Sequence, residues 1–166
     1  MRKVTIGTVL FDQTKGAAVV TLVEEDGGRM LPIFIGLWEG SAIFRELNRS
    51  PAQRPLLHDL FAHVLHGLQA RLEKIVIDSM SGNTFYAQLH LKQNETTMVA
   101  DARPSDAVAL ALKCQAPIYV AERVLETAGK QEDMAMVEEG EKPPAAAEDV
   151  KAWLENIRPE DFADPT

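Results

Sequence analysis

Three apolar, β-branched segments separated by short turns constrain the fold of this chain more than any other feature of its sequence. They cover Lys3–Phe11, Ala17–Val23 and Arg29–Ile35, and their composition and alternation predict a strand in each. Gly16 and the Asp-Gly pair at 26–27 suit tight turns. Strands linked so closely form an antiparallel meander. Because Pro32 has no N–H to donate, it places the third strand at an edge or a bulge.

The following residues, up to about 129, mix helical and strand patterns. Strands are expected over 72–78, 84–91, 96–101 and 118–120, and helices over 38–48, 56–70, 104–114 and 121–127. The clearest helix is 56–70, with a broad apolar stripe at 3.6-residue spacing made of Leu57, Leu60, Phe61, Val64, Leu65 and Leu68. The sequence therefore predicts an α+β fold with a compact, mostly antiparallel sheet and helices packed on it.

The net charge of −8 is distributed unevenly along the 166 residues. Residues 1–129 hold 14 acidic and 13 basic side chains, a net of −1, whereas residues 130–166 hold 11 and 4, a net of −7. Nucleic-acid-binding proteins usually carry a basic surface, so the total charge argues against such a partner. Since the acid is concentrated in the tail, that objection is weakened for the body of the protein.

The composition shift near residue 130 predicts three parts: a domain over 1–129, an acidic linker containing Pro and Ala over 130–146, and a C-terminal amphipathic helix and tail over 147–166. Val150, Trp153, Leu154 and Ile157 share one face of that helix, which is too short to be stable alone. We expect it to dock on the body or on another subunit, and this motivates the expectation of a homo-oligomer such as a dimer.

Composition also limits the location of the protein. With 46% hydrophobic residues the chain can build a core, but no apolar run approaches the roughly 20 residues of a membrane-spanning helix. The N-terminus lacks the pattern of a signal peptide, and the single cysteine, Cys114, cannot form an internal disulfide. We therefore expect a cytoplasmic protein with no membrane partner.

Polar side chains gather at three element ends, where functional sites usually lie. The first cluster contains Glu39, the second His58 and Asp59, and the third Asp101, Arg103 and Asp106. Each also has a purely structural interpretation, because carboxylates favour the first turn of a helix and an arginine can pair with them. His63 and His66 share a face with Asp59, but that face lies opposite the apolar stripe and is expected to be solvated.

Taken together, these segments resemble the bifunctional nuclease domain family over residues 1 to about 129. The resemblance rests on Leu31–Gly36 followed by Glu39, and on the segments 54–60, 82–87, 101–107 and 116–120. The run Asp-Ala-Arg-Pro-Ser-Asp at 101–106 is its most specific element. The resemblance implies an α+β fold and a nuclease that acts on both RNA and DNA.

Motif position and side-chain chemistry then suggest a role for each residue. The expected catalytic residues are His58, Asp59, Asp101, Arg103 and Asp106, with Arg103 binding phosphate and His58 acting as general acid or base. Glu39, Asp101 and Asp106 would hold Mg²⁺ or Mn²⁺, which prefer oxygen ligands. Contacts with RNA and DNA are expected to be weak and local. Two alternatives stay open: a non-enzymatic oligomeric scaffold or regulatory module, and a protein that binds nucleotides or other anions at the helix start near Pro104.

Overall fold

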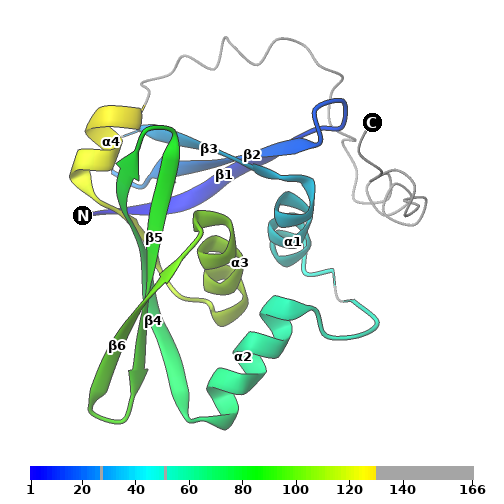
Figure 1. Cartoon of the computed structure of the whole chain (residues 1–166), viewed down its shortest axis with the longest axis vertical. Coiled ribbons are helices and arrows are strands. Elements are labelled where there is room, and N and C mark those ends of the chain that lie inside the picture. Colours follow the sequence, from blue (N-terminus) through cyan, green and yellow to red (C-terminus); the bar gives the residue numbers. More distant parts are fainter. Residues whose placement is uncertain (27, 51, 130–166) are drawn as a thin grey trace. The chain divides into compact units, whose positions relative to one another are not determined.

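In the computed structural model, which describes residues 1–26, 28–50 and 52–129, the strands form one seven-stranded sheet (Figure 1). Its strand order is β3-β2-β1-β7-β4-β5-β6. The strands are β1 (Arg2–Asp12), β2 (Ala17–Glu24), β3 (Met30–Gly36), β4 (Ala70–Ser81), β5 (Thr84–Gln93), β6 (Thr96–Ala102) and β7 (Ile118–Val120). Within the same described region the helices are α1 (Leu37–Leu47), α2 (Leu57–Gly67), α3 (Pro104–Cys114) and α4 (Glu122–Ala128).

The sheet consists of two antiparallel arms joined by β7. One arm is the meander β1–β2–β3, and the other is β4–β5–β6. Between them, β7 pairs antiparallel with β1 and parallel with β4. The prediction of a mostly antiparallel sheet in an α+β fold is thus confirmed. Pro32 lies in β3, an edge strand, as its missing N–H requires.

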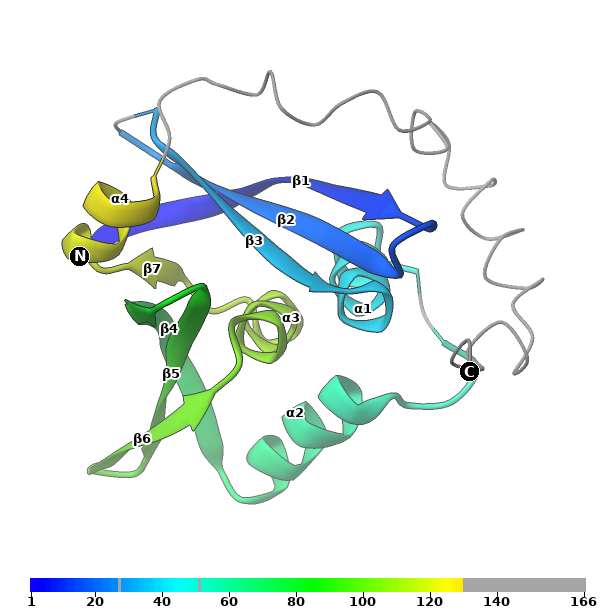
Figure 2. The same cartoon turned by 45° about the horizontal axis from the view of Figure 1, so that its top comes forward.

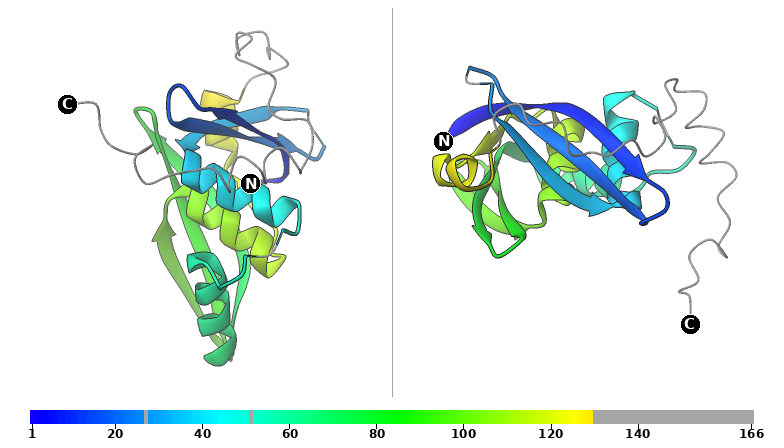
Figure 3. Two further views of the ribbon diagram at one scale, coloured as in Figure 1. Left: turned by 90° about the vertical axis from the view of Figure 1, so that its right-hand side faces the viewer. Right: turned by 90° about the horizontal axis from the view of Figure 1, so that it is seen from above.

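Helix α3 lies inside the curve of the sheet, between the two arms (Figure 2). Its sequence explains this place, because small alanine side chains allow a helix to approach a sheet closely. Five consecutive residues of α3, Ala107–Ala111, are buried. Views from two further sides show α1 and α2 on the same side of the sheet as α3 (Figure 3). Both of these helices contact α3, and α2 also contacts β4.

Most of the apolar stripe of helix α2 does not face the core, although its sequence pattern suggests that it would. Of the stripe residues, Leu65 is buried, whereas Leu57, Leu60, Phe61, Val64 and Leu68 are exposed. The side of α2 that faces the protein carries His58, Asp59 and Ala62, which are partly buried. The expected solvation of Asp59 is therefore wrong, although His63 and His66 are exposed as expected. The predicted helix is also too long, since Gln69 has a φ of 56° and Ala70 already belongs to β4.

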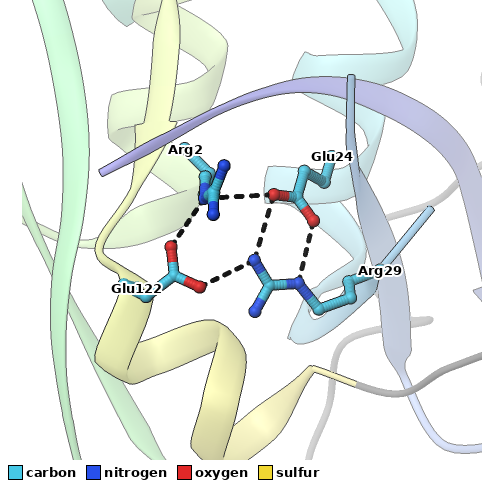
Figure 4. A network of polar contacts seen from close by, with 4 residues as sticks. All are labelled: Arg2, Glu24, Arg29 and Glu122. Atoms are coloured by element: carbon cyan, nitrogen blue, oxygen red, sulfur yellow. Dashed lines mark hydrogen bonds and ion pairs between the residues drawn. The ribbon is translucent and has the colours of Figure 1, made fainter. Parts of the chain in front are cut away.

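Four charged side chains hold the end of the β1–β2–β3 arm against α4 (Figure 4). Glu24 is 3% exposed and binds Arg29 through two hydrogen bonds, of 2.8 and 3.0 Å. Glu122 of α4 contacts Arg2 at 2.7 Å and Arg29 at 2.9 Å. The hydrogen bonds from Arg29 lower the pKa of the Glu24 carboxyl, despite its burial. This network links residues that are about 120 positions apart in sequence.

No helix among the described residues is long and apolar enough to cross a membrane. The predicted linker over 130–146 and the predicted amphipathic helix over 147–166 lie outside the described residues. Every predicted site residue lies within the described residues.

Candidate functional site

First-turn side chains of three helices meet around Arg103. Glu39 lies in the first turn of α1, His58 in that of α2, and Asp106 in that of α3. Arg103 itself is the N-cap residue of α3, where β6 ends and Pro104 begins the helix. Pro104 suits this position because the first helical N–H has no partner within the helix. The N-termini of α1, α2 and α3, each with a partial positive charge, thus lie close to one another around Arg103.

Arg103 holds two of these first turns together. Its Nε and Nη2 donate to the two carboxylate oxygens of Asp106, at 2.7 and 3.1 Å, which is the bidentate geometry that only arginine offers. Its Nη1 donates to Oε1 of Glu39 at 3.0 Å. The guanidinium nevertheless remains accessible, because the Arg103 side chain is 65% exposed. An exposed arginine above converging helix ends is suited to bind an anion.

His58 approaches the same carboxylate from α2. Its Nε2 lies 3.4 Å from Oδ1 of Asp106, while the His58 side chain is 20% exposed. The Nε2 atom is itself buried and makes no well-aligned hydrogen bond to any described residue. Hydrogen bonds at catalytic groups are often long without substrate. His58 and Asp106 therefore form a loose imidazole–carboxylate pair, and Arg103 keeps the carboxylate in place.

The backbone at the start of α1 leaves room for the Glu39 side chain. Gly36 is the N-cap residue of α1, and a Cβ atom built there would collide with the carboxylate of Glu39. A side chain at position 36 would therefore have to displace the end of the flexible Glu39 side chain, although the backbone itself would accept it, since φ is −73°. The Gly36–Glu39 spacing in the sequence reflects this packing.

A second ionic group lies one helix length away along α3. Nζ of Lys113 contacts Oε1 of Glu46 at 2.7 Å and Oδ1 of Asp59 at 2.5 Å. The other oxygen of Asp59 accepts a hydrogen bond from the backbone N–H of Leu56 at 2.8 Å, which caps α2. Both oxygens of Asp59 therefore have structural partners. Through Lys113, this carboxylate fixes the start of α2, and with it the position of His58.

The pKa directions fit this arrangement. Burial alone would raise the pKa of the Asp106 carboxyl, but hydrogen bonds from Arg103, with a smaller contribution from His58, lower it below its usual range. The hydrogen bond from Lys113 is the main cause that lowers the pKa of Asp59. Burial opposes charging of Lys113, yet its contacts with Asp59 and Glu46 raise its pKa. All three groups are thus held in their charged forms at neutral pH.

A pocket of about 220 Å³ opens beside these two groups. Its walls come from α1, residues 50, 52, 55 and 56, the start of α2 and the end of α3. The charged and titratable side chains that line it are Arg45, Glu46, His58, Asp59, His63 and Lys113. His58 lines the pocket and also belongs to the group of side chains around Arg103, so a molecule in the pocket would lie next to that group.

Besides Asp59, which pairs with Lys113, Asp101 is the other predicted site residue that does not contact Arg103, His58, Glu39 or Asp106. It lies on β6 opposite Gln88 and is exposed, and its side chain makes no hydrogen bond or ion pair with another described residue. Its neighbours Ala100 and Ala102 pack against the core. Since side chains alternate along a strand, Asp101 points to the other face of the sheet.

The predicted metal ligands do not converge as they stand. Glu39 and Asp106 both point to Arg103, which places a guanidinium where a cation would bind. In the described part of the chain, no group of three His, Cys, Asp or Glu side chains is arranged to hold a metal ion. The residues in this arrangement do not fit the Mg²⁺ or Mn²⁺ site expected from sequence.

Sequence reasoning missed Lys113 and Glu46. Lys113 ends an alanine-rich helix, where a cation is ordinary, and Glu46 lies near the end of α1. Neither belongs to a recognisable motif. The only available signal was the seven-residue spacing between Asp106 and Lys113, which places both on one face of α3.

The family model of the bifunctional nuclease domain matches residues 20–133. An uncharacterised protein of Mycobacterium tuberculosis is 36% identical over 168 residues, covering 98% of both chains.

The chain is also similar to two plant nucleases. Bifunctional nuclease 1 of Arabidopsis thaliana is 26% identical over 157 residues, which cover 92% of this chain and 47% of the plant protein. Bifunctional nuclease 1 of Oryza sativa subsp. indica is 25% identical over 118 residues, covering 69% of this chain and 36% of the rice protein. With the family model matching more than half of its length, the chain belongs to the bifunctional nuclease domain family.

Proposed function

We propose that the protein is a nuclease that hydrolyses phosphodiester bonds in RNA and DNA at the Arg103 cluster, which consists of Glu39, His58, Arg103 and Asp106. The observation that carries the proposal is the exposed Arg103 guanidinium beside the His58–Asp106 pair, at the junction of three helix N-termini. The similarity to plant proteins named as bifunctional nucleases supports the same activity.

Each residue of the cluster has a distinct role in this proposal. Arg103 binds the phosphate of the scissile bond, and the helix N-termini add positive potential where the transition state gains negative charge. His58 transfers a proton to or from the attacking or leaving oxygen. Asp106 is a positioning residue, because it holds both the imidazole and the guanidinium. Glu39 occupies one N–H group of Arg103 until a phosphate replaces it.

The net charge of −1 over residues 1–129 sets how the substrate is bound. Such a body offers little long-range attraction to a polyanion. Binding therefore depends on local contacts with Arg103, and we expect it to be weak and sensitive to salt. Adjacent to the cluster, the pocket that His58 lines is a place for a base or sugar of the substrate.

The test is cleavage of single-stranded RNA and single-stranded DNA by the full chain, with and without EDTA. We expect His58→Asn to reduce kcat by about 10²-fold or more, because general acid–base catalysis contributes on this order. Arg103→Ala should lose a comparable amount through weaker phosphate and transition-state binding. Comparing cleavage with and without EDTA shows whether the activity needs a divalent cation, a requirement that stays a prediction from sequence.

Two matched controls lie away from the cluster. His66→Asn changes an exposed histidine on the same helix as His58, and Arg123→Ala changes an arginine that is 69% exposed on α4. Both variants should cleave like the wild type. If all four variants cleave equally, the activity belongs to another site or to a contaminant, and the proposal fails. Asp101→Asn is informative as well, because a loss equal to that of Asp106→Asn would mean that the exposed carboxylate on β6 reaches the substrate.

Anion binding without hydrolysis is the second candidate function, and Arg103 at the start of α3 favours it. A protein that binds mononucleotides with an affinity that Arg103→Ala abolishes, yet cleaves neither RNA nor DNA, would be a nucleotide-binding protein and not a nuclease.

A further inference from the structure

The outer side of α2 is an apolar surface that the described residues leave uncovered. Five large side chains form this α2 apolar face: Leu57, Leu60, Phe61, Val64 and Leu68. They are between 41% and 72% exposed, and Leu56, just before the helix, is 46% exposed. Single exposed apolar residues are normal on a protein surface, but six within thirteen consecutive positions are a contiguous patch. Burial in this protein's own described core does not explain why α2 carries them.

The area of the patch is large enough to matter for association. A side chain of this size exposes roughly 150–200 Å² when free, so six that are about half exposed offer on the order of 500 Å². A standard protein–protein interface buries about 800 Å² on each partner. The α2 apolar face would therefore supply the apolar centre of such an interface, and the polar residues around it would supply the rim.

The charge of α2 suits contact with an identical surface. Between Leu57 and Gly67, Asp59 is the only Asp, Glu, Lys or Arg, and it is turned inward to Lys113. No formal charge remains on the outer side of this helix to repel a second copy. Interface centres are depleted in charged residues in the same way.

The spacing of the face matches an antiparallel pair of identical helices. Leu57, Phe61, Val64 and Leu68 are separated by four, three and four residues, the seam of a two-stranded helical contact. This pattern is symmetric about the midpoint between residues 62 and 63. If two copies cross there in opposite directions, Phe61 faces the second copy's Val64, and Leu57 faces its Leu68. Such a contact is isologous and closes as a two-fold dimer.

We propose that the α2 apolar face is a homodimer interface, in which α2 packs antiparallel against α2 of a second copy. The inference is independent of the nuclease proposal, because it rests on apolar exposure, charge and spacing. It has a consequence for the cluster around Arg103, since α2 also carries His58 in its first turn. Packing of α2 on both sides would fix this helix more firmly than its contacts with α3 and β4 alone.

The first test is the mass of the full chain in solution, measured by sedimentation equilibrium from about 1 to 100 µM. We expect a dimer for the wild type, and a shift of about tenfold or more toward monomer for Phe61→Glu, because a charge at the centre of an apolar interface cannot be solvated. The matched control is Phe34→Glu. Phe34 is 77% exposed on β3, an edge strand of the sheet that is separate from α2. That variant should remain as dimeric as the wild type. Circular dichroism of both variants checks that the fold is intact.

A cross-link tests the antiparallel register directly. In a Cys114→Ser background, Phe61→Cys combined with Val64→Cys should give a covalent dimer on mild oxidation, because the two thiols face each other across the two-fold axis. His63→Cys combined with His66→Cys, on the other side of the helix, should not. A wild type that is monomeric at the highest concentration would overturn the proposal, including the case in which residues 147–166 of the same chain cover α2. A dimer that survives Phe61→Glu unchanged would also overturn it, since the interface would then lie elsewhere.

Discussion

The side chains around Arg103 show how one arginine can join residues that lie far apart in sequence. Glu39 and Arg103 are separated by 64 positions, and yet they are 3.0 Å apart. Arginine suits this place better than lysine because its planar guanidinium contacts Asp106 with two N–H groups and still reaches Glu39 with a third. The same exposed guanidinium is available to a phosphate only if one of these contacts is given up.

Glu39 is the contact most easily given up, and this leads to a prediction. It forms one hydrogen bond to Arg103, whereas Asp106 forms two. Removing its charge in Glu39→Gln should weaken the contact with Arg103 and lower the KM for polynucleotides by about three- to tenfold, a gain typical of one charged contact. Steady-state cleavage at fixed ionic strength measures this effect.

The control for Glu39→Gln is Glu126→Gln, which makes the same change of charge at an exposed position of α4. Its KM should equal that of the wild type. A different outcome is informative: if Glu39→Gln loses activity together with any stimulation by Mg²⁺ or Mn²⁺, then Glu39 is a metal ligand, as the sequence suggested, and it does not compete with the substrate.

At the scale of elements, α2 shows that a clear helical pattern does not reveal which side of the helix faces the core. Leu65 is the buried member of the apolar stripe, and the polar side of the helix places His58 and Asp59, both partly buried, toward the rest of the domain. The helix is held at its N-terminus, where Asp59 accepts a hydrogen bond from the Leu56 N–H and pairs with Lys113. Further along the helix, Leu65 lies in the core and Ala62 packs against it.

The cap on α2 predicts a measurable loss of stability. Asp59→Ala removes the hydrogen bond to the Leu56 N–H and leaves Lys113 with Glu46 alone, so we expect the free energy of unfolding to fall by about 1–2 kcal/mol. Urea denaturation at pH 7 measures the change. Asp101→Ala is the comparison, since this exposed carboxylate has no polar partner among the described residues and should alter stability by less than about 0.5 kcal/mol. An equal loss in both variants would show that Asp59 is not a cap.

At the scale of the whole described domain, the two arms of the sheet share only the three-residue strand β7 as a bridge. The network of Arg2, Glu24, Arg29 and Glu122 adds a second connection, from the first arm to α4, which follows β7 directly (Figure 4). Because Glu24 is buried, it depends on both arginines for compensation of its charge. Removing one partner of a buried ion pair leaves the other charge uncompensated.

This network predicts how stability depends on pH. Hydrogen bonds from Arg29 lower the pKa of Glu24, and hydrogen bonds from Arg2 and Arg29 lower that of Glu122. A carboxyl whose pKa is lower in the folded state stabilises the protein fully above its unfolded pKa of about 4.3, and the stabilisation is lost as the pH falls through the folded value. We therefore expect stability to be flat from about pH 7 to 5 and to decrease below about pH 4.5.

Denaturation of the wild type and of Glu24→Gln at several pH values checks this expectation. The variant should be less stable at pH 7, and its stability should fall less steeply between about pH 5 and 3, because one of the titrating groups is gone. Parallel curves for the two proteins would mean that Glu24 does not contribute to acid unfolding.

The sequence by itself determined the elements of this fold and the residue types of the site. Alternating apolar runs and turn residues located the strands, Pro104 marked the start of α3, and Pro32 identified an edge strand, because these signals act over a few neighbouring residues. The motif around Arg103 could be located in the same way. The family of the protein could be inferred as well, because the order and spacing of the motifs can be read directly from one sequence.

Only the tertiary structure decided which residues meet. Arg103 lies between Glu39 and Asp106, Lys113 joins Asp59 to Glu46, and Asp101 lies on the other face of the sheet. The reason is that periodicity fixes a side chain's direction relative to its own helix or strand, but not the rotation of that element in the fold. For α2, whose apolar and polar sides could each have faced the core, that choice was made by packing against α3, the Asp59–Lys113 ion pair and the His58–Asp106 contact.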